Sequence, residues 1–342
     1  MTALAETCEL AAKVAFLERP DSYPDRPSAV EAVETHLAWV FLTDRHAYKL
    51  KKPVRYPFLD FTTVAARRHD AEEEVRLNRR LAPAVYLDVV ALTADARRRF
   101  AIGGAGAPVD WLVRMRRLPR ERMLDHVIAA QTVDGVDGAA LRAVAELLVA
   151  FYRHAPRAPL SPLAYRERLR AEIAANGSAL AEARYGLPAD VIARTVAAQD
   201  AFLEREASVL DARVSAGRIV EGHGDLRPEH ICLGPPPAII DCVEFNREFR
   251  TLDAADELAY LAMECERLGA PSVGAMLLVH YHALAEDHPP DRLIHFYESV
   301  RAVLRAKLAA WHLDDPTVRY PSQWFNRAQA YLTLADRHIR EA

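Results

Sequence analysis

The sequence has 342 residues, of which 51% are hydrophobic and 27% are charged, and its formal net charge is -4 at pH 7. A chain of this length and composition is expected to fold as a globular protein with a large buried core, arranged as two lobes. Its slightly acidic charge argues against nucleic acid or an anionic membrane as the partner, so we expect a small-molecule partner.

The cysteines and the hydrophobic runs indicate the compartment. The four cysteines are widely scattered and form no CxxC pair, which favours a reducing cytoplasm over an oxidising compartment. The N-terminus carries Glu6 and Glu9 in a mixed amphipathic stretch, without the basic segment and apolar core of an export signal. No run of 18 apolar residues occurs. We therefore expect a cytoplasmic protein that is neither exported nor inserted into a membrane.

Residues 1–28 are predicted to form a helical N-terminal extension. Apolar residues stand there at helical spacing and precede the turn-forming stretch ERPDSYPDRP. Residues 29–118 change to short β-type runs separated by turns, with one helix over 62–81. Five strands and one helix predict a small antiparallel α+β lobe over 29–118. The strand runs cover 29–36, 37–42, 46–52, 85–92 and 109–115.

Residues 119–342 are predicted to form a larger, mainly helical lobe, so the expected fold class is α+β. One segment breaks the helical pattern, because β-type runs flank Gly and Pro in RIVEGHGDLRPEHICL and PPPAIIDCVEF. We expect the function to lie there, in a catalytic loop over 222–230 and a metal-binding segment over 238–245. The helical stretches cover 141–151, 188–213, 273–286, 291–312 and 324–340.

Two aspartates in this segment are suited to phosphoryl transfer. Asp225 lies in HGD after a predicted strand, and Asp241 ends the apolar run of the next strand. Phosphoryl transfer needs one carboxylate to orient the attacking hydroxyl and another to hold the magnesium ion that bridges the phosphates. The simple alternative is that both aspartates cap turns. The order of a strand lysine, a helix glutamate, HGD and IID along the chain favours catalysis.

A lysine and a glutamate precede these aspartates. Lys49, in AYKL, has the setting of the strand lysine that pairs nucleotide phosphates, and it is preferred to Lys51 on the same strand face. A solvated basic edge is the simple alternative for both lysines. The following helix offers Glu74, which shares a helix face with Leu77 and is preferred to Glu73 as the partner of the lysine.

Together these residues resemble the aminoglycoside phosphotransferase family, which has a protein-kinase-like fold and includes choline, homoserine and fructosamine kinases. The catalytic stretch HGDLHxxN of that family stands here as HGDLRPEH. The resemblance implies that Asp225 is the catalytic base, with His223 and Arg227 as further catalytic candidates, and that Asp241 binds the metal. It also implies ATP and Mg²⁺ as cofactors and a small-molecule hydroxyl as the phosphate acceptor.

Some further residues support this resemblance, and others depart from the pattern of the family. Asp253 and Asp256 resemble the downstream D-x-x-x-DLA stretch that braces the catalytic loop. His230 replaces the usual metal-binding asparagine, and imidazole is a poor ligand for Mg²⁺, so His230 is either an altered metal ligand or a structural histidine. No Gly-rich phosphate loop is present. Thr35, in the first predicted hairpin, is the candidate that would contact phosphates in its place.

The residues of several motifs resemble those of a bacterial subgroup of uncharacterised aminoglycoside phosphotransferase-like proteins more closely than those of antibiotic-resistance enzymes. These motifs are LKKPV, FLDF, EEEVRLNRRLAP, HGDLRPEHICL and IIDCVEFN. Some members of that subgroup carry an additional P-loop kinase domain. The sequence contains no GxxxxGK[ST], so we expect it to be the kinase-like part alone.

Two alternative functions remain open at this point. A pseudokinase would bind nucleotide without turnover, and the residue at position 230 and the missing Gly-rich loop support that reading. A zinc protein is the third possibility, although the spacing H-x6-H-x-C-x9-C is not a common zinc pattern. Its candidate ligands are His223, His230, Cys232 and Cys242.

Overall fold

The computed structural model describes residues 3–130, 136–315 and 318–342, and it describes side chains from residue 9 onward. Glu6 and Cys8 therefore lie outside the residues whose side chains are described. The chain divides into two compact units, each assembled from more than one segment of the sequence. The first contains Met1–Met123, His230–Gly234 and Ala238–Phe249, and the second contains Leu124–Glu229, Pro235–Pro237 and Arg250–Ala342.

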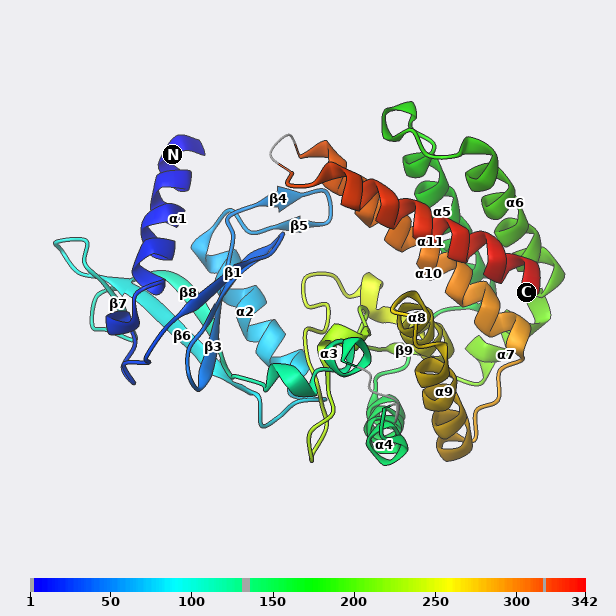
Figure 1. Cartoon of the computed structure of the whole chain (residues 1–342), viewed down its shortest axis with the longest axis horizontal. Helices are drawn as coiled ribbons and strands as arrows, with labels where there is room; N and C mark the ends of the chain where they lie inside the picture. Colours follow the sequence, from blue (N-terminus) through cyan, green and yellow to red (C-terminus); the bar gives the residue numbers. More distant parts are fainter. Residues whose placement is uncertain (1–2, 131–135, 316–317) are drawn as a thin grey trace. The chain divides into compact units, whose positions relative to one another are not determined.

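An antiparallel sheet of six strands is the framework of the first unit, in the order β1-β2-β3-β8-β6-β7 (Figure 1). Five strands of the sheet lie where the sequence predicts them, and the predicted count of five for residues 29–118 is corrected by β7 and by a separate two-stranded hairpin. This strand has only three residues and follows a run of arginines, so it shows no alternating pattern and is defined by its pairing with β6. The elements are β1 (Glu31–Glu34), β2 (Ala38–Leu42), β3 (His46–Lys51), β6 (Tyr86–Ala94), β7 (Phe100–Ile102), β8 (Ala107–Arg116), a separate hairpin of β4 (Arg55–Tyr56) and β5 (Leu59–Asp60), and the helices α1 (Ala3–Leu17) and α2 (Val64–Asn78).

The two faces of this sheet pack against different helices. On β3, Tyr48 belongs to the core cluster that contains Leu17 of α1. Its neighbour Ala47 belongs to the cluster that contains Val75 of α2. Because successive side chains of a strand point to opposite faces, the odd-numbered positions of β3 all point toward α2. The lysines at positions 49 and 51 therefore face that helix.

Helix α2 is held in place at its beginning and along its length. Thr63 caps it by accepting a hydrogen bond from the Ala66 N–H at 3.1 Å, and the helix ends at Asn78, so it is shorter than the predicted 62–81. The Arg67 guanidinium donates to both carboxylate oxygens of Asp110 on β8, at 2.8 and 2.9 Å. This buried bidentate pair restricts rotation of the helix and keeps one face of it toward β3.

The second unit is mainly helical, as predicted, and the helices predicted over 188–213, 273–286, 291–312 and 324–340 correspond to α6 with α7, α9, α10 and α11. Helix α8 is its most buried helix, since twelve consecutive residues from its start are buried. Among the described residues no helix is both long and apolar enough to span a membrane. The helices are α3 (Leu124–Ala129), α4 (Gly138–His154), α5 (Pro162–Leu180), α6 (Ala189–Arg205), α7 (Ala207–Ser215), α8 (Ala254–Arg267), α9 (Pro271–Ala285), α10 (Asp291–Trp311) and α11 (Pro321–Glu341), and β9 (Ile219–Glu221) pairs with β12 (Thr251–Asp253) (Figure 1).

The segment that is predicted to bind a metal ion, residues 238–245, belongs to the first unit and not to the helical second unit. Strand β10 (Ile231–Cys232) pairs with β11 (Ala238–Ile239), and Cys232 forms a β-bridge with Met123 at the end of the first unit. After β11, the Cys242 N–H donates to the side chain of Asn78 on α2 at 2.9 Å. These long-range contacts place residues 238–245 in the first unit, although the sequence predicts them in the helical lobe. The functional domain boundaries remain predictions.

Candidate functional site

Lys49 joins two of the predicted carboxylates in the first unit. Its Nζ lies 2.9 Å from Glu74 Oε1 on α2 and 2.7 Å from Asp241 Oδ1 after β11. The Glu74 side chain is 1% exposed, whereas that of Asp241 is 45% exposed. Glu73, the alternative to Glu74, is paired with Arg76 on the outer side of the helix. The lysine is therefore oriented by a buried carboxylate and directed toward one that solvent and ligands reach.

Lys51 lies beside Lys49 and contacts the same glutamate. Its Nζ is 2.7 Å from Glu74 Oε2, and it also forms ion pairs with Asp70 and Glu244. The contact with Asp70, at 2.5 Å, is an ion pair without the angles of a hydrogen bond. Because Lys51 is only 3% exposed and is surrounded by buried acids, its position is that of a structural cation. Both lysines thus use Glu74, but only Lys49 reaches Asp241.

The ion pairs of this network bring four carboxylates to two ammonium groups. Burial raises the pKa of Glu244, although Lys51 opposes the shift. Burial acts to lower the pKa of Lys49, but Asp241 and Glu74 outweigh it and hold that pKa well above its usual value. Burial also acts to lower the pKa of Lys51. The carboxylates of Glu244 and Glu74 outweigh this effect, so the pKa of Lys51 is raised. Both lysines stay charged, and the partly exposed Asp241 carboxylate offers the oxygen donors that a hard divalent cation prefers.

The backbone around Asp241 is held in an uncommon conformation. Asp241 has a φ of 64°, in the left-handed region that Asp tolerates better than most residues. Its N–H donates to the Tyr86 hydroxyl at 3.1 Å, and the Asn78 side chain accepts from the next residue, so two neighbouring elements stabilise this conformation. The His230 Nε2 lies 3.5 Å from Asp241 Oδ2. The two residues predicted for the metal position are therefore in contact.

In the second unit, the side chain of Asp225 is contacted at both oxygens. The Tyr260 hydroxyl, from α8, donates to Oδ1 at 2.9 Å, and Arg227 lies 2.9 Å from Oδ2. Burial acts to lower the pKa of Arg227, but Asp225 and Tyr260 outweigh it, so its pKa is raised and it stays charged. The His223 Nδ1 accepts from the Asp225 N–H at 3.3 Å. The three catalytic candidates of the HGDLR stretch thus form one connected group.

The backbone of this loop is held by Glu257, a residue that the sequence reasoning missed. Its carboxylate accepts from the N–H groups of His223 at 2.9 Å and Gly224 at 2.5 Å, and from the Tyr152 hydroxyl at 2.6 Å. The sequence did carry a signal for it. In a D-x-x-x-D pattern that begins at Asp253, the second acid stands at position 257, which is Glu257, and not at Asp256.

The two aspartates predicted to brace the loop instead hold arginines. Asp253 accepts from Arg213 at both oxygens and caps α8, and Asp256 accepts from Arg301 at both oxygens. They stabilise the helix that carries Glu257, and their contribution to the loop is made through that helix.

Replacing Glu257 by Ala is expected to lower the free energy of unfolding by about 3 kcal/mol or more, because it leaves buried donors of the loop without an acceptor. Glu257→Gln is the matched control, since it keeps one oxygen in place for the two backbone N–H groups. Urea unfolding of both variants and the wild type measures the difference. If Glu257→Ala is as stable as Glu257→Gln, the carboxylate does not support the loop.

Thr35, which is predicted to contact phosphates, lies in a hydrogen-bonded turn. The Thr35 hydroxyl donates to the Ala38 carbonyl at 2.9 Å and accepts from its N–H at 3.0 Å, and the Thr35 N–H donates to the same carbonyl. Its donors are thus engaged within the β1–β2 turn, and phosphate binding by Thr35 stays a prediction.

The predicted zinc ligands His223, His230, Cys232 and Cys242 are not found as a metal-ligand group. In the described part of the chain, the only group of three potential ligands is His295, His338 and Glu341.

Comparison with known sequences gives relatives without an assigned activity. No protein-family model matches the sequence. Uncharacterized proteins of Mycobacterium tuberculosis and Mycobacterium bovis are 34% identical to it over 329 residues, which is 94% of this chain. The chain spans 62% of the length of these curated relatives.

Comparison with solved structures gives small-molecule kinases. A choline/ethanolamine kinase family protein from Mesorhizobium loti has a TM-score of 0.51 at 16% identity, covering 98% of this chain and 100% of that one. Choline kinase from Cryptosporidium parvum has a TM-score of 0.52 at 10% identity, with coverages of 98% and 97%. A thermostable mutant of aminoglycoside phosphotransferase APH(4)-Ia has a TM-score of 0.53 at 13% identity, with coverages of 92% and 94%. At these identities the likeness concerns the fold alone, and the chain has the two-lobed α+β fold of the protein-kinase-like proteins.

Proposed function

We propose that this chain is an ATP- and Mg²⁺-dependent phosphotransferase that acts on a hydroxyl group of a small molecule. The observation that carries the proposal is the position of Lys49 between buried Glu74 and accessible Asp241. A kinase needs a lysine that is oriented by a helix glutamate and lies beside a metal-binding aspartate. The likeness in fold to choline kinase and aminoglycoside phosphotransferase structures supports the same reading.

In this proposal the first unit binds the nucleotide. Lys49 contacts the phosphates, Glu74 orients Lys49, and Asp241 holds the magnesium ion. The residues present fit such an ion, because carboxylate oxygens suit Mg²⁺ and the Asp241 carboxylate is accessible to solvent. When bound, the ion neutralises charge on the phosphates. His230 contacts Asp241 and borders the metal position, and its imidazole suits Mn²⁺ better than Mg²⁺.

The second unit would supply the base. Asp225 accepts the proton of the acceptor hydroxyl while that oxygen bonds to the γ-phosphorus, and the bond from the γ-phosphorus to the bridging oxygen of ADP breaks. Tyr260 and Arg227 hold the Asp225 carboxylate in one orientation. His223 shapes the loop through its contact with the Asp225 N–H, so His223 and Arg227 are positioning residues.

The test is ATP binding and turnover by the purified protein with Mg²⁺ and then Mn²⁺. Candidate acceptors are aminoglycosides, sugars, amino alcohols and nucleosides. We expect acceptor-dependent release of ADP, and the acceptor that responds identifies the substrate class. A protein that binds no ATP with either metal contradicts the assignment of Lys49, Glu74 and Asp241.

A pseudokinase is the second candidate. It is favoured by His230 at the position of a metal-binding asparagine and by the engagement of the Thr35 donors within their own turn. It predicts ATP binding without ADP release on the whole acceptor panel.

We further propose a reducing, cytoplasmic setting for this protein, since Cys232, Cys242 and Cys265 are buried free thiols.

A further inference from the structure

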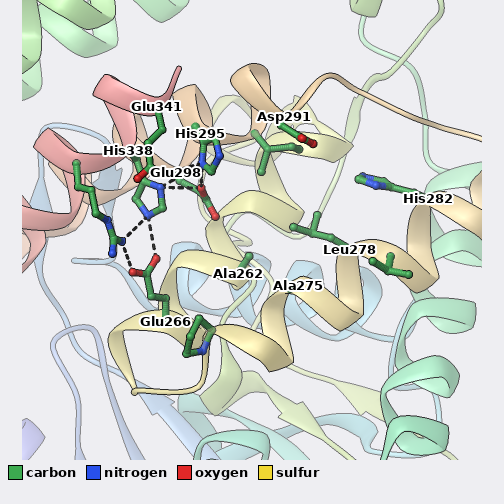
Figure 2. Close-up of a pocket in the computed structure, with 14 residues that line it drawn as sticks. Ala262, Glu266, Ala275, Leu278, His282, Asp291, His295, Glu298, His338 and Glu341 are labelled. Carbon is green, nitrogen blue, oxygen red and sulfur yellow. Dashed lines mark hydrogen bonds and ion pairs between the residues drawn. The ribbon is translucent and has the colours of Figure 1, made fainter.

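A cluster of histidines and glutamates in the second unit has no part in the proposed phosphoryl transfer. Helix α10 carries His295 and Glu298, and α11 carries His338 and Glu341, so each helix has an H-x-x-E pair. Residues three apart share a helix face. The helices run antiparallel along each other, and Figure 2 shows the two pairs converging at one end of them.

The potential ligand atoms of this cluster lie at distances typical of a metal site. His295 Nδ1 is 3.3 Å from His338 Nδ1, and Glu298 Oε2 is 3.0 and 2.9 Å from these two atoms. Glu341 Oε2 is 3.7 Å from His295 Nδ1. Ligand atoms around a tetrahedral Zn²⁺ with bonds of about 2.0–2.1 Å are about 3.3 Å apart. Small side-chain movements therefore suffice to place a metal ion among them.

A carboxylate outside the cluster orients one of the imidazoles. Glu266 on α8 lies 2.9 Å from His338 Nε2, which Arg337 also approaches at 3.1 Å. When Nδ1 binds a metal ion, a hydrogen on Nε2 can be donated to the Glu266 carboxylate. The His338 Nδ1 is then directed toward the other ligands. Histidines that bind metals commonly donate their second N–H to a carboxylate in this way. Arg337 pairs with Glu266 and fixes it in turn.

We infer that His295, Glu298, His338 and Glu341 form a binding site for a divalent transition metal of the Zn²⁺ type. Two imidazole nitrogens and two carboxylate oxygens suit Zn²⁺ rather than Mg²⁺ or Ca²⁺. An ion can reach them, because they line a cavity of about 460 Å³ and Glu341 is half-exposed (Figure 2). The ion would cross-link α10 and α11, so its role is structural.

The test is Zn²⁺ binding by metal-stripped full-length protein, measured by competition with a chromophoric chelator. We expect one Zn²⁺ per chain and a thermal midpoint that rises with Zn²⁺. Co²⁺ in its place should show the absorption of tetrahedral coordination. His295→Ala and Glu341→Gln change partly exposed ligands and should each weaken binding by at least about tenfold. Glu266→Gln should weaken it about 10–100-fold, as the loss of an orienting carboxylate does.

His282→Ala is the matched control, because His282 lines the same cavity from α9 but does not belong to the group of His295, His338 and Glu341. It should bind Zn²⁺ as the wild type does. The inference is overturned if the wild type binds no Zn²⁺, since the cluster then holds protons alone. It is also overturned if His295→Ala and Glu341→Gln bind Zn²⁺ as tightly as the wild type, because the ion then lies elsewhere.

Discussion

Asp225→Asn is expected to lower kcat by about 10²–10⁴-fold while ATP binding is kept, the loss typical of removing a general base. Asn has nearly the same shape and still accepts from Tyr260 at one oxygen, but it does not take up the proton of the acceptor hydroxyl. Because the nucleotide contacts proposed for Lys49 and Asp241 are unchanged, the affinity for ATP should be unchanged. Steady-state kinetics with the responding acceptor and calorimetric ATP titration measure the two quantities.

Glu229→Gln is the control for that measurement. Glu229 is the other carboxylate that Arg227 contacts, and it lies in the same loop but has no proposed role in the reaction. Its turnover should stay within a few-fold of the wild type. An Asp225→Asn protein that retains more than a tenth of the wild-type kcat contradicts the assignment of Asp225 as the base.

Lys51→Met is expected to lower the free energy of unfolding by about 3–5 kcal/mol, the range for removing one partner of a buried ion pair. Lys51 is 3% exposed and compensates Asp70, Glu74 and Glu244 together. Its loss leaves Asp70 without this cation and Glu74 with Lys49 alone. Urea unfolding followed by circular dichroism measures the change.

Lys49→Met is the matched comparison on the same strand. It leaves Asp241 solvated at its exposed side, and Glu74 still contacts Lys51, so the loss of stability should be the smaller of the two. ATP binding should be lost, because Lys49 is the lysine that reaches Asp241. If Lys49→Met unfolds more readily than Lys51→Met and still binds ATP, the roles of the two lysines are the reverse of those proposed.

Local patterns in the sequence were sufficient to predict most elements. Alternation on the third strand predicted that Lys49 and Lys51 share a face, and the contacts of both with Glu74 agree. Helical spacing predicted α4, α6, α7, α9, α10 and α11 of the second unit, whereas α5 and α8 were not among the predicted stretches. These features depend on the geometry of two to four neighbouring residues, which the sequence shows directly. Strand β7 was missed because three residues are too few to show such a pattern.

Contacts between distant residues were decided by the tertiary structure. The Lys49–Asp241 pair joins positions 192 residues apart, and the sequence supplies only candidates for such a pair. Glu257 accepts hydrogen bonds from the backbone of the 222–230 loop, and its spacing from Asp253 marks the position without showing that its carboxylate is a buried acceptor. The two H-x-x-E pairs acquire meaning only when α10 and α11 pack antiparallel.

The sequence by itself therefore indicated most of the secondary structure, the α+β class and the set of residues from which the proposed phosphotransferase site is built. The tertiary structure decided which glutamate contacts Lys49, which lysine contacts Asp241, and which unit holds residues 238–245. The physical reason is that backbone geometry repeats over a few residues, whereas the partner of a buried charge is selected by packing and desolvation across the whole fold.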